Sequence, residues 1–404
     1  MYSSEELKYL KEKEFEKREK RLEKSIPQKL KYQKELKKDK LHITYVMTWT
    51  GVCGGTKIIL EHANRLTERG HKITLISHDV KPTWFPINTN IQFIQVPWTE
   101  VLCKSIPKCD LIVATYWREI YECIEQKIAP VIYFEQGDFH LFDMQELDER
   151  TYKYIKKQLE NVQFVYTVSS FAKEKIKSIY NKESKVIPNA VDKNIFYHNN
   201  NKRKHKNTYI TIIGAQQSEF KHINDILEAI KILRKEGYKI NLNWITPVKP
   251  EKTRLKAIIN PPQIEIANSL RKSDIYVCAS MYESFCLPVL EAMTCGAAVI
   301  TTNNGGNADF VKDHENALNI QKENINDICE KIKLLINNTN LRNKIAKNGI
   351  ETSKRYSWDK VIDEIEEYYK EVSKYKVCKE KKKKKSVNIW RCKARNRKGK
   401  RIRI

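Results

Sequence analysis

The sequence lacks the patterns that would assign it to several other protein classes. None of its 10 cysteines belongs to a Cys-x-x-Cys pair, and no cysteines and histidines have zinc-ligand spacing. No run approaches the roughly 18 apolar residues of a membrane-spanning helix. Residues 1–40 contain no apolar segment typical of a signal peptide. We therefore expect a cytoplasmic protein with reduced thiols, most of them small buried hydrophobic groups.

Charged residues are abundant but unevenly distributed. The sequence has 404 residues, of which 31% are charged, and a net charge of +25. Residues 1–40 hold 14 basic and 9 acidic residues, and residues 374–404 hold 16 basic residues and 1 acidic residue, so residues 41–373 carry only +5. We expect residues 1–40 to form a charged helix with little apolar face, either solvated or disordered.

The basic tail, residues 374–404, favours an anionic partner. Trp390 and the isoleucines Ile389 and Ile402 add apolar anchors, which favours a membrane surface. The nearly balanced body and the absence of a nucleic-acid motif argue against a nucleic-acid partner. We expect the tail to contact the inner face of the plasma membrane.

Strand and helix patterns alternate from Leu41 onward. His42–Met47 is predicted as a strand, and a turn with Gly54 and Gly55 leads to a helix over residues 57–69. A strand at residues 72–77 completes a βαβ unit, which builds a parallel sheet. Further strands are predicted at residues 91–96, 110–115, 131–135, 164–168 and 185–187, with a helix near residues 147–159.

A second alternating set follows a polar linker at residues 199–206. Strands are predicted at residues 209–213, 240–245, 274–279, 298–302 and 317–320, with a helix at 223–235. A last amphipathic helix, residues 357–373, precedes the tail. The expected fold is α/β, with two Rossmann-like doubly wound domains, residues 41–198 and 207–356, facing across a cleft. Ligands of such sheets bind outside the carboxyl ends of the strands.

Residues 282–296 are the most informative segment. Pro288 fits the first turn of a helix, where its missing N–H costs nothing. The free backbone amides around Phe285 and Leu287 would then face the cleft, an arrangement that binds phosphate. Glu283 precedes this turn and Glu291 is expected in the first helical turn, where carboxylates accept hydrogen bonds from sugar or ribose hydroxyls.

Glu283 and Glu291, with seven residues between them, resemble the Glu-x(7)-Glu motif of retaining glycosyltransferases of family 4, which have the GT-B fold. Other segments resemble the family in the expected order over residues 41–372. They are the glycine pair Gly54-Gly55, residues 186–192 at the domain junction, the turn at residues 304–307, and Trp358 with its helix crossing back to the first domain.

The resemblance implies roles for individual residues. Glu291 would hold the donor ribose, Glu283 would contact the transferred sugar, and Lys221 would bind the donor diphosphate. The amides of Gly54 and Gly55 would approach the phosphates or the acceptor. Charge develops on the leaving diphosphate, so a cation and aligned amides are the expected catalytic groups. The other implied donor-binding residues are Asn189, Ser284, Phe285, Cys286 and Leu287.

The sequence departs from the family pattern at two positions. Ala215 follows Gly214 where the family has an arginine, the second cation for the diphosphate. Cys286 replaces a glycine. A catalytic histidine often follows a strand of the first domain. His140 is the candidate here, with Asp138 and Glu135 nearby, and the sequence alone does not choose among them. No Asp-x-Asp triplet occurs, so we expect no metal ion and no cofactor beyond the nucleotide sugar as co-substrate.

The expected function is transfer of a hexose or similar sugar from a nucleotide diphosphate-sugar to a surface glycan or lipid-linked acceptor, with retention of configuration. Two alternatives remain open. One is a catalytically degenerate glycan-binding or scaffold protein, which Ala215 favours. The other is a nucleotide-sugar epimerase of the same fold, against which the Glu-x(7)-Glu pattern argues.

Overall fold

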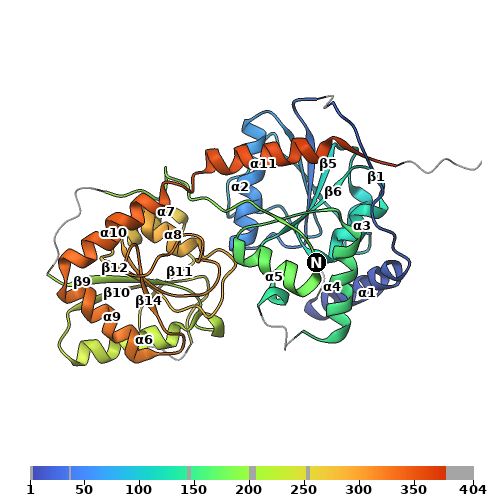
Figure 1. Ribbon diagram of the computed structural model, residues 1–404. Coiled ribbons are helices and arrows are strands. Elements are labelled where there is room, and N and C mark those ends of the chain that lie inside the picture. Colours follow the sequence, from blue (N-terminus) through green and yellow to red (C-terminus); the bar gives the residue numbers. More distant parts are fainter. Residues whose placement is uncertain (1–2, 36–37, 143–146, 200–205, 252–254, 379–404) are drawn as a thin grey trace, which may run out of the picture.

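The chain folds into two α/β domains (Figure 1). The computed structural model describes residues 3–35, 38–142, 147–199, 206–251 and 255–378. Each domain is built on a sheet whose strands pair in parallel, as the sequence predicts. The central strands Leu111–Ala114, Val131–Glu135 and Ala298–Thr302 are largely apolar and buried from end to end, which is typical of parallel sheets covered by helices on both faces.

The first domain has a seven-stranded sheet in the order β4-β3-β2-β5-β6-β7-β8. Its strands are β2 (His42–Met47), β3 (Lys72–Ser77), β4 (Gln92–Gln95), β5 (Leu111–Ala114), β6 (Val131–Glu135), β7 (Phe164–Thr167) and β8 (Lys185–Val186). Its helices are α2 (Gly54–Glu68), α3 (Ile120–Glu125), α4 (Glu149–Asn161) and α5 (Ser170–Tyr180), with 3-10 turns η1 (Leu102–Ser105), η2 (Trp117–Glu119) and η3 (Phe139–Leu141). The order reverses direction at β2, which opens a ligand site at the carboxyl ends of the strands.

The second domain has a six-stranded sheet in the order β11-β10-β9-β12-β13-β14. Its strands are β9 (Thr208–Ile213), β10 (Ile240–Thr246), β11 (Ala257–Ile259), β12 (Ile275–Cys278), β13 (Ala298–Thr302) and β14 (Leu318–Ile320). Its helices are η4 (Glu219–Lys221), α6 (Ile223–Lys235), α7 (Gln263–Lys272), α8 (Leu287–Thr294), α9 (Ile325–Asn337) and α10 (Thr339–Ser353).

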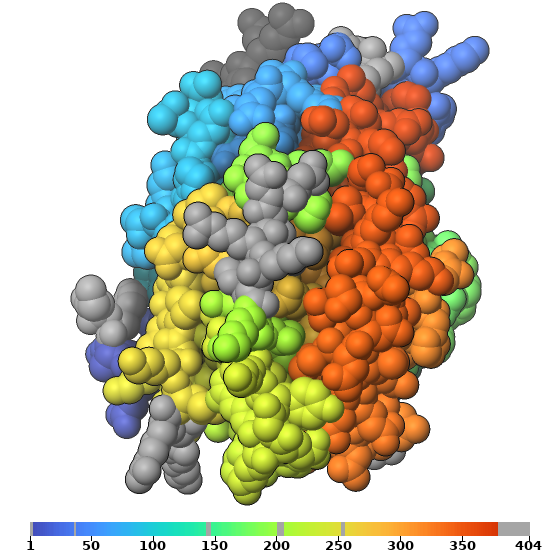
Figure 2. Space-filling model, turned by 90° about the vertical axis from the view of Figure 1, so that its left-hand side faces the viewer, coloured from blue at the N-terminus to red at the C-terminus, as the bar shows by residue number. Residues whose placement is uncertain are grey.

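The last helix, α11 (Trp358–Ser373), leaves the second domain and packs on the first (Figure 1). The hydroxyl of Tyr369 lies 3.1 Å from that of Tyr45 in β2 and 2.8 Å from that of Tyr166 in β7. In Figure 2 the orange and red residues form a continuous band along one side of both domains. The predicted crossing helix is therefore present.

Residues 1–40 contain the charged helix that the sequence predicts, α1 (Ser4–Glu23). The helix is docked on the first domain (Figure 1), so the prediction that the segment is solvated or disordered is wrong for the described part. Arg18 is buried and donates hydrogen bonds to Glu119 (3.1 Å) and Glu122 (3.1 Å). Leu22 is also buried, and Phe15 packs on Tyr154, so the docked face of the helix combines an ion-pair network with apolar contacts.

Strand β1 (Leu30–Tyr32) pairs antiparallel with β15 (Tyr375–Val377), so the start of the predicted tail belongs to the folded part. Most of the predicted linker, residues 200–205, and most of the basic tail, residues 379–404, lie outside the described residues. Among the residues that are described, no helix has the length and apolar character needed to cross a membrane.

Candidate active site

An ion pair between Lys221 and Glu283 marks the carboxyl ends of the second sheet. Lys221 ends the short turn η4 after β9, and Glu283 follows β12. Their side chains are largely buried, at 21% and 15% exposed, and Lys221 Nζ donates a hydrogen bond to Glu283 Oε1. Burial opposes the charged ammonium, but the Glu283 carboxylate outweighs it and raises the pKa of Lys221 above its ordinary value. Lys221 is therefore a permanent cation.

The backbone of Glu283 is fixed by the turn at residues 304–307. Glu283 N–H donates to the Asn304 carbonyl at 3.0 Å. Gly306 lies so close that a Cβ there would meet the Glu283 carbonyl oxygen at 2.5 Å. Gly305 has φ +84° and its Cβ would clash with Phe171 of the first domain. These two glycines permit the close packing that the turn requires.

Helix α8 begins at Leu287 because Cys286 adopts a left-handed conformation, with φ +65°. That conformation favours glycine, which gives a physical reason for the glycine of the family pattern. Pro288 occupies the first turn, as predicted. Glu291 is the fifth residue of the helix and lies in its second turn, so its predicted first-turn position is wrong.

Lys57 of the first domain reaches across to Glu291. Its Nζ lies 3.1 Å from Glu291 Oε1, and both side chains are largely buried. Helix α2 begins at Gly54, three residues before the predicted start, so Gly54 and Gly55 lie in its first turn, where amides have no partner within the helix. We did not predict a role for Lys57 from the sequence, although its position two residues after the glycine pair could have indicated one.

Gln136, which follows β6, also belongs to this region. A Cβ on Gly55 would lie 3.4 Å from Gln136 Nε2, whereas a Cβ on Gly54 would meet no atom of another described segment within 4 Å. The first turn of α2 therefore contacts the end of β6 on one side and is open on the other.

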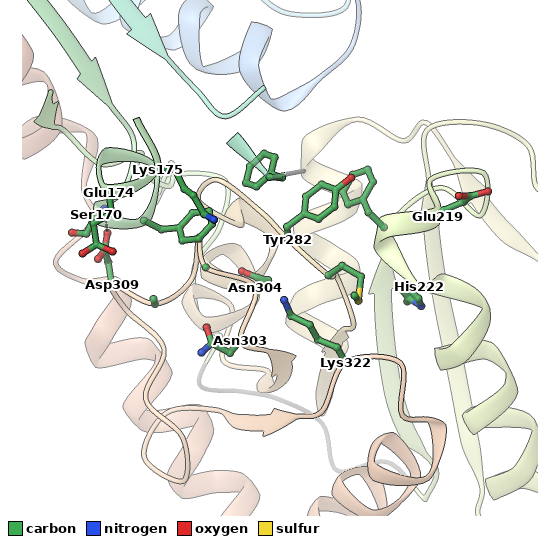
Figure 3. A pocket seen from close by; sticks show the side chains of 16 residues that line it. Ser170, Glu174, Lys175, Glu219, His222, Tyr282, Asn303, Asn304, Asp309 and Lys322 are labelled. Carbon is green, nitrogen blue, oxygen red and sulfur yellow. Dashed lines mark hydrogen bonds between the residues drawn. The ribbon is translucent and has the colours of Figure 1, made fainter. Parts of the chain in front are cut away.

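A cavity of about 810 Å³ lies between the domains, lined by sequence neighbours of Lys221 and Glu283 but not by these two residues themselves (Figure 3). In Figure 3 Tyr282 lies at its centre, between Ser170 and Lys175 on one side and His222 on the other. Four aromatic side chains that line the cavity stack one on the next. Their centroids are 6.0 Å apart from Phe171 to Phe142, 4.7 Å from Phe142 to Tyr282 and 5.0 Å from Tyr282 to Phe220.

Direct hydrogen bonds also join the two domains at this point. Ser169 Oγ donates to the Ser284 carbonyl at 2.6 Å, and the Ser170 N–H donates to Asp309 at 2.8 Å. Ser284 therefore contacts the first domain through its backbone. The predicted cleft is present, and its walls touch beside the Glu283 turn.

His140 does not face the cleft. It is fully buried, with Nε2 3.1 Å from Glu135 and Nδ1 3.1 Å from the Tyr180 hydroxyl. Glu135 also accepts hydrogen bonds from Tyr133 and the Gly137 N–H. Burial opposes ionisation of Glu135, but His140 and these donors lower its pKa. The structure contradicts the prediction of a catalytic His140, because the ring is held in a closed internal network.

The remaining predicted donor residues differ in their surroundings. Phe285 is buried and packs on Phe310 and Tyr356, so its side chain belongs to the core. Asn189 is also buried, and its Oδ1 has no hydrogen-bond partner within the described ranges. Ala215 is buried and offers no cation. Asn189 and the amide cradle at Phe285, Cys286 and Leu287 stay predictions.

Comparisons with known proteins agree with this arrangement. Residues 194–352 match the family model for glycosyl transferases group 1. The chain is 30% identical over 228 residues to an uncharacterized glycosyltransferase of Methanocaldococcus jannaschii, covering 54% of this chain and 63% of the relative. It is 30% identical over 110 residues to the N,N'-diacetylbacillosaminyl-diphospho-undecaprenol alpha-1,3-N-acetylgalactosaminyltransferase of Campylobacter jejuni, covering 27% of this chain and 29% of the relative.

Among solved structures, the chain is similar to Anabaena HepE in complex with UDP-glucose, with a TM-score of 0.68 and 15% identity over 81% of this chain and 99% of the other. This likeness establishes the GT-B fold. The chain spans less than two thirds of the length of both relatives described above. Residues 194–352, which include most of the second domain, thus match the glycosyl transferases group 1 model, and the chain has the GT-B fold.

Proposed function

We propose that the protein transfers a sugar from a nucleotide diphosphate-sugar to a glycan or lipid-linked acceptor, with retention and without a metal ion. The Lys221–Glu283 ion pair at the carboxyl ends of the second sheet is the observation that carries this proposal. A cation stabilises the charge that develops on the leaving diphosphate, and a neighbouring carboxylate accepts hydrogen bonds from the sugar.

The proposed donor lies between α2 and α8. Glu291 holds the ribose. When the nucleotide enters, Lys57 leaves the Glu291 carboxylate and binds the donor phosphates. Lys57 thereby replaces the arginine that is absent at Ala215. Support comes from the 3.1 Å Lys57–Glu291 contact, which brings a cation of the first domain to the donor residues. Asn189 offers a buried oxygen without a partner in the described part of the chain.

The proposed acceptor is a surface glycan or a lipid-linked sugar held at the inner face of the plasma membrane. The Campylobacter relative is named for a diphospho-undecaprenol substrate. Residues 379–404 hold 14 basic residues and 1 acidic residue, a charge that favours an anionic membrane. The proposed reaction involves no nucleic-acid partner.

A panel of nucleotide sugars tests the proposal. Thermal melting is measured with each nucleotide sugar, and release of nucleotide diphosphate is followed in the presence of membrane extract as acceptor source. We expect one donor to raise the melting temperature and to release its nucleotide. Absence of both effects for all common donors would refute the proposal.

A degenerate sugar-binding protein is the second candidate, favoured by Ala215 in place of a cation. It predicts stabilisation by a nucleotide sugar or glycan with no nucleotide release under any acceptor condition. The same panel therefore separates the two functions.

A further inference from the structure

Two buried cysteines lie beside the Lys221–Glu283 ion pair. Cys278 ends β12 and Cys286 precedes α8, and both side chains are buried, at 8% and 3% exposed. Their sulfurs are 3.8 Å apart, and one Glu283 carboxylate oxygen lies within 4.8 Å of both. No other cluster of three possible metal ligands occurs among the described residues.

The sulfur spacing fits a tetrahedral ion. Zinc binds thiolate sulfur at about 2.3 Å, so two sulfurs on one tetrahedral ion lie about 3.8 Å apart. The observed spacing is the same. A carboxylate oxygen is an accepted third ligand, and a three-ligand set leaves one position for water.

Polar side chains contact both sulfurs. Asn304 Nδ2 donates to Cys286 Sγ at 3.6 Å, and Ser280 Oγ lies 3.4 Å from Cys278 Sγ. Such outer contacts orient metal ligands and adjust their basicity.

The charges of a loaded site would balance. Two thiolates and one carboxylate carry three negative charges, which a divalent ion and the Lys221 ammonium neutralise. Glu283 Oε1 accepts a hydrogen bond from Lys221. A carboxylate has two oxygens with about four acceptor sites, so one carboxylate can bind both an ion and the Lys221 ammonium.

We propose that Cys278, Cys286 and Glu283 form a binding site for a thiophilic divalent cation such as Zn²⁺. An occupied site takes the Glu283 oxygen that a sugar hydroxyl would use, so the ion inhibits transfer. This second consequence rests on the proposed function, whereas binding of the ion does not.

Titration of the reduced full-length protein with Co²⁺ tests binding without any activity assay, because cobalt bound by thiolate gives a near-ultraviolet charge-transfer band. We expect this band in the native protein and its displacement by Zn²⁺. Cys278→Ser and Cys286→Gly should weaken binding by on the order of tenfold or more. Glycine suits the left-handed backbone at residue 286, so this variant should fold.

Cys123→Ser is the matched control. Cys123 lies 3.5 Å from Cys103 in a second buried thiol pair, which belongs to no described three-ligand cluster. The control should keep the band. A native protein without the band, a band that survives Cys278→Ser, or a spontaneous Cys278–Cys286 disulfide under the same conditions would overturn the proposal.

Zinc inhibition is measured for each variant relative to its own zinc-free rate. We expect inhibition of the native protein and the Cys123→Ser control, and relief in Cys278→Ser. If no protein shows transfer, but the cobalt band is present in the native protein and weakened in the Cys278 and Cys286 variants, the proposed function fails and the metal site stands. Equal inhibition of native protein and Cys278→Ser would overturn inhibition through this site.

Discussion

Lys57 of α2 and Glu291 of α8 form an ion pair across the domain boundary, with Nζ 3.1 Å from Oε1. Each residue comes from the first two turns of its helix. The proposed donor must replace this contact, with ribose hydroxyls on Glu291 and phosphate on Lys57. On this proposal, donor binding changes a contact between the two domains.

Removal of either partner of this pair should weaken donor use. A hydrogen bond to a charged group contributes about 1.5–3 kcal/mol, so Glu291→Ala should lower kcat/KM roughly tenfold to a hundredfold. Lys57→Met should lower it by about tenfold. Lys177→Met, which removes an exposed ion pair with Glu183, is the control and should leave kinetics unchanged. Unaltered kcat/KM in Glu291→Ala would remove this residue from the site.

Substitution of the Lys221–Glu283 pair should act on the chemical step. Loss of a preorganised charge that stabilises a developing anion costs on the order of 100- to 1000-fold in kcat. Lys221→Met should show this loss, and Glu283→Gln should lose both kcat and stability because it leaves a nearly buried ammonium without its charge partner.

Steady-state kinetics and thermal melting of both variants check this prediction. The exposed Lys231–Glu228 pair on α6 provides the control, and Lys231→Met should match the native protein. A Lys221→Met variant with native kcat would show that another group stabilises the diphosphate.

Chelation should not reduce transfer. The absence of Asp-x-Asp and the presence of Lys57 and Lys221 favour a diphosphate neutralised by side-chain cations. We expect full activity in EDTA, and a higher rate if zinc occupied the Cys278–Cys286–Glu283 site beforehand. Activity that vanishes with the chelator and returns with magnesium or manganese would contradict this mechanism.

The basic tail should bind anionic membrane and be dispensable for chemistry. Because β15 pairs with β1, the chain should be truncated after Cys378 rather than after Ser373. Basic residues near an anionic surface contribute about 1 kcal/mol each, and salt screens this attraction. Liposome sedimentation should show binding of the full-length protein that weakens with salt and is lost on truncation, with native turnover on a soluble acceptor.

Retained liposome binding by the truncated protein would exclude the tail as the anchor. Preferential binding of the full-length protein to RNA at matched salt would also contradict the membrane prediction.

Docking of α11 should weaken in acid. Burial of Glu366 opposes its ionisation, but hydrogen bonds from Lys370, Arg69 and His71 lower its pKa from 4.5 to about 2. A depressed folded-state pKa means that the stabilisation is complete above about pH 4.5 and is lost as pH falls toward 2. Melting temperature measured between pH 6 and 3 should fall less steeply in Glu366→Gln. The exposed Glu371→Gln on the same helix should keep the native slope.

The sequence predicted the sheets better than the contacts between them. The bounds of β6, α6 and β13 were predicted to the residue, because each is a strongly patterned apolar or amphipathic segment. Docking of α1 was missed because Arg18 pairs with residues about a hundred positions away, and a charge pattern alone does not distinguish such pairs from solvated side chains.

In the candidate site, too, local segments were predicted and contacts between elements were missed. The Glu283 turn and Lys221 were predicted from one continuous segment and one resemblance. The glycine pair was a local signal for Lys57, but the Lys57–Glu291 and Cys278–Cys286 contacts depend on how separate elements meet, which no local pattern encodes. His140 was chosen by proximity in sequence to a strand end, yet its side chain turns inward to Glu135.

The most direct test of sugar transfer is the product formed by the native protein and by Glu283→Gln. The donor identified by melting is supplied with membrane extract, and the labelled sugar recovered on the acceptor is analysed by mass spectrometry and NMR. We expect one nucleotide diphosphate released per sugar transferred, the donor's anomeric configuration in the product, and at least about a hundredfold less product from Glu283→Gln. Nucleotide release without a glycosylated acceptor, or equal product from both proteins, would contradict it.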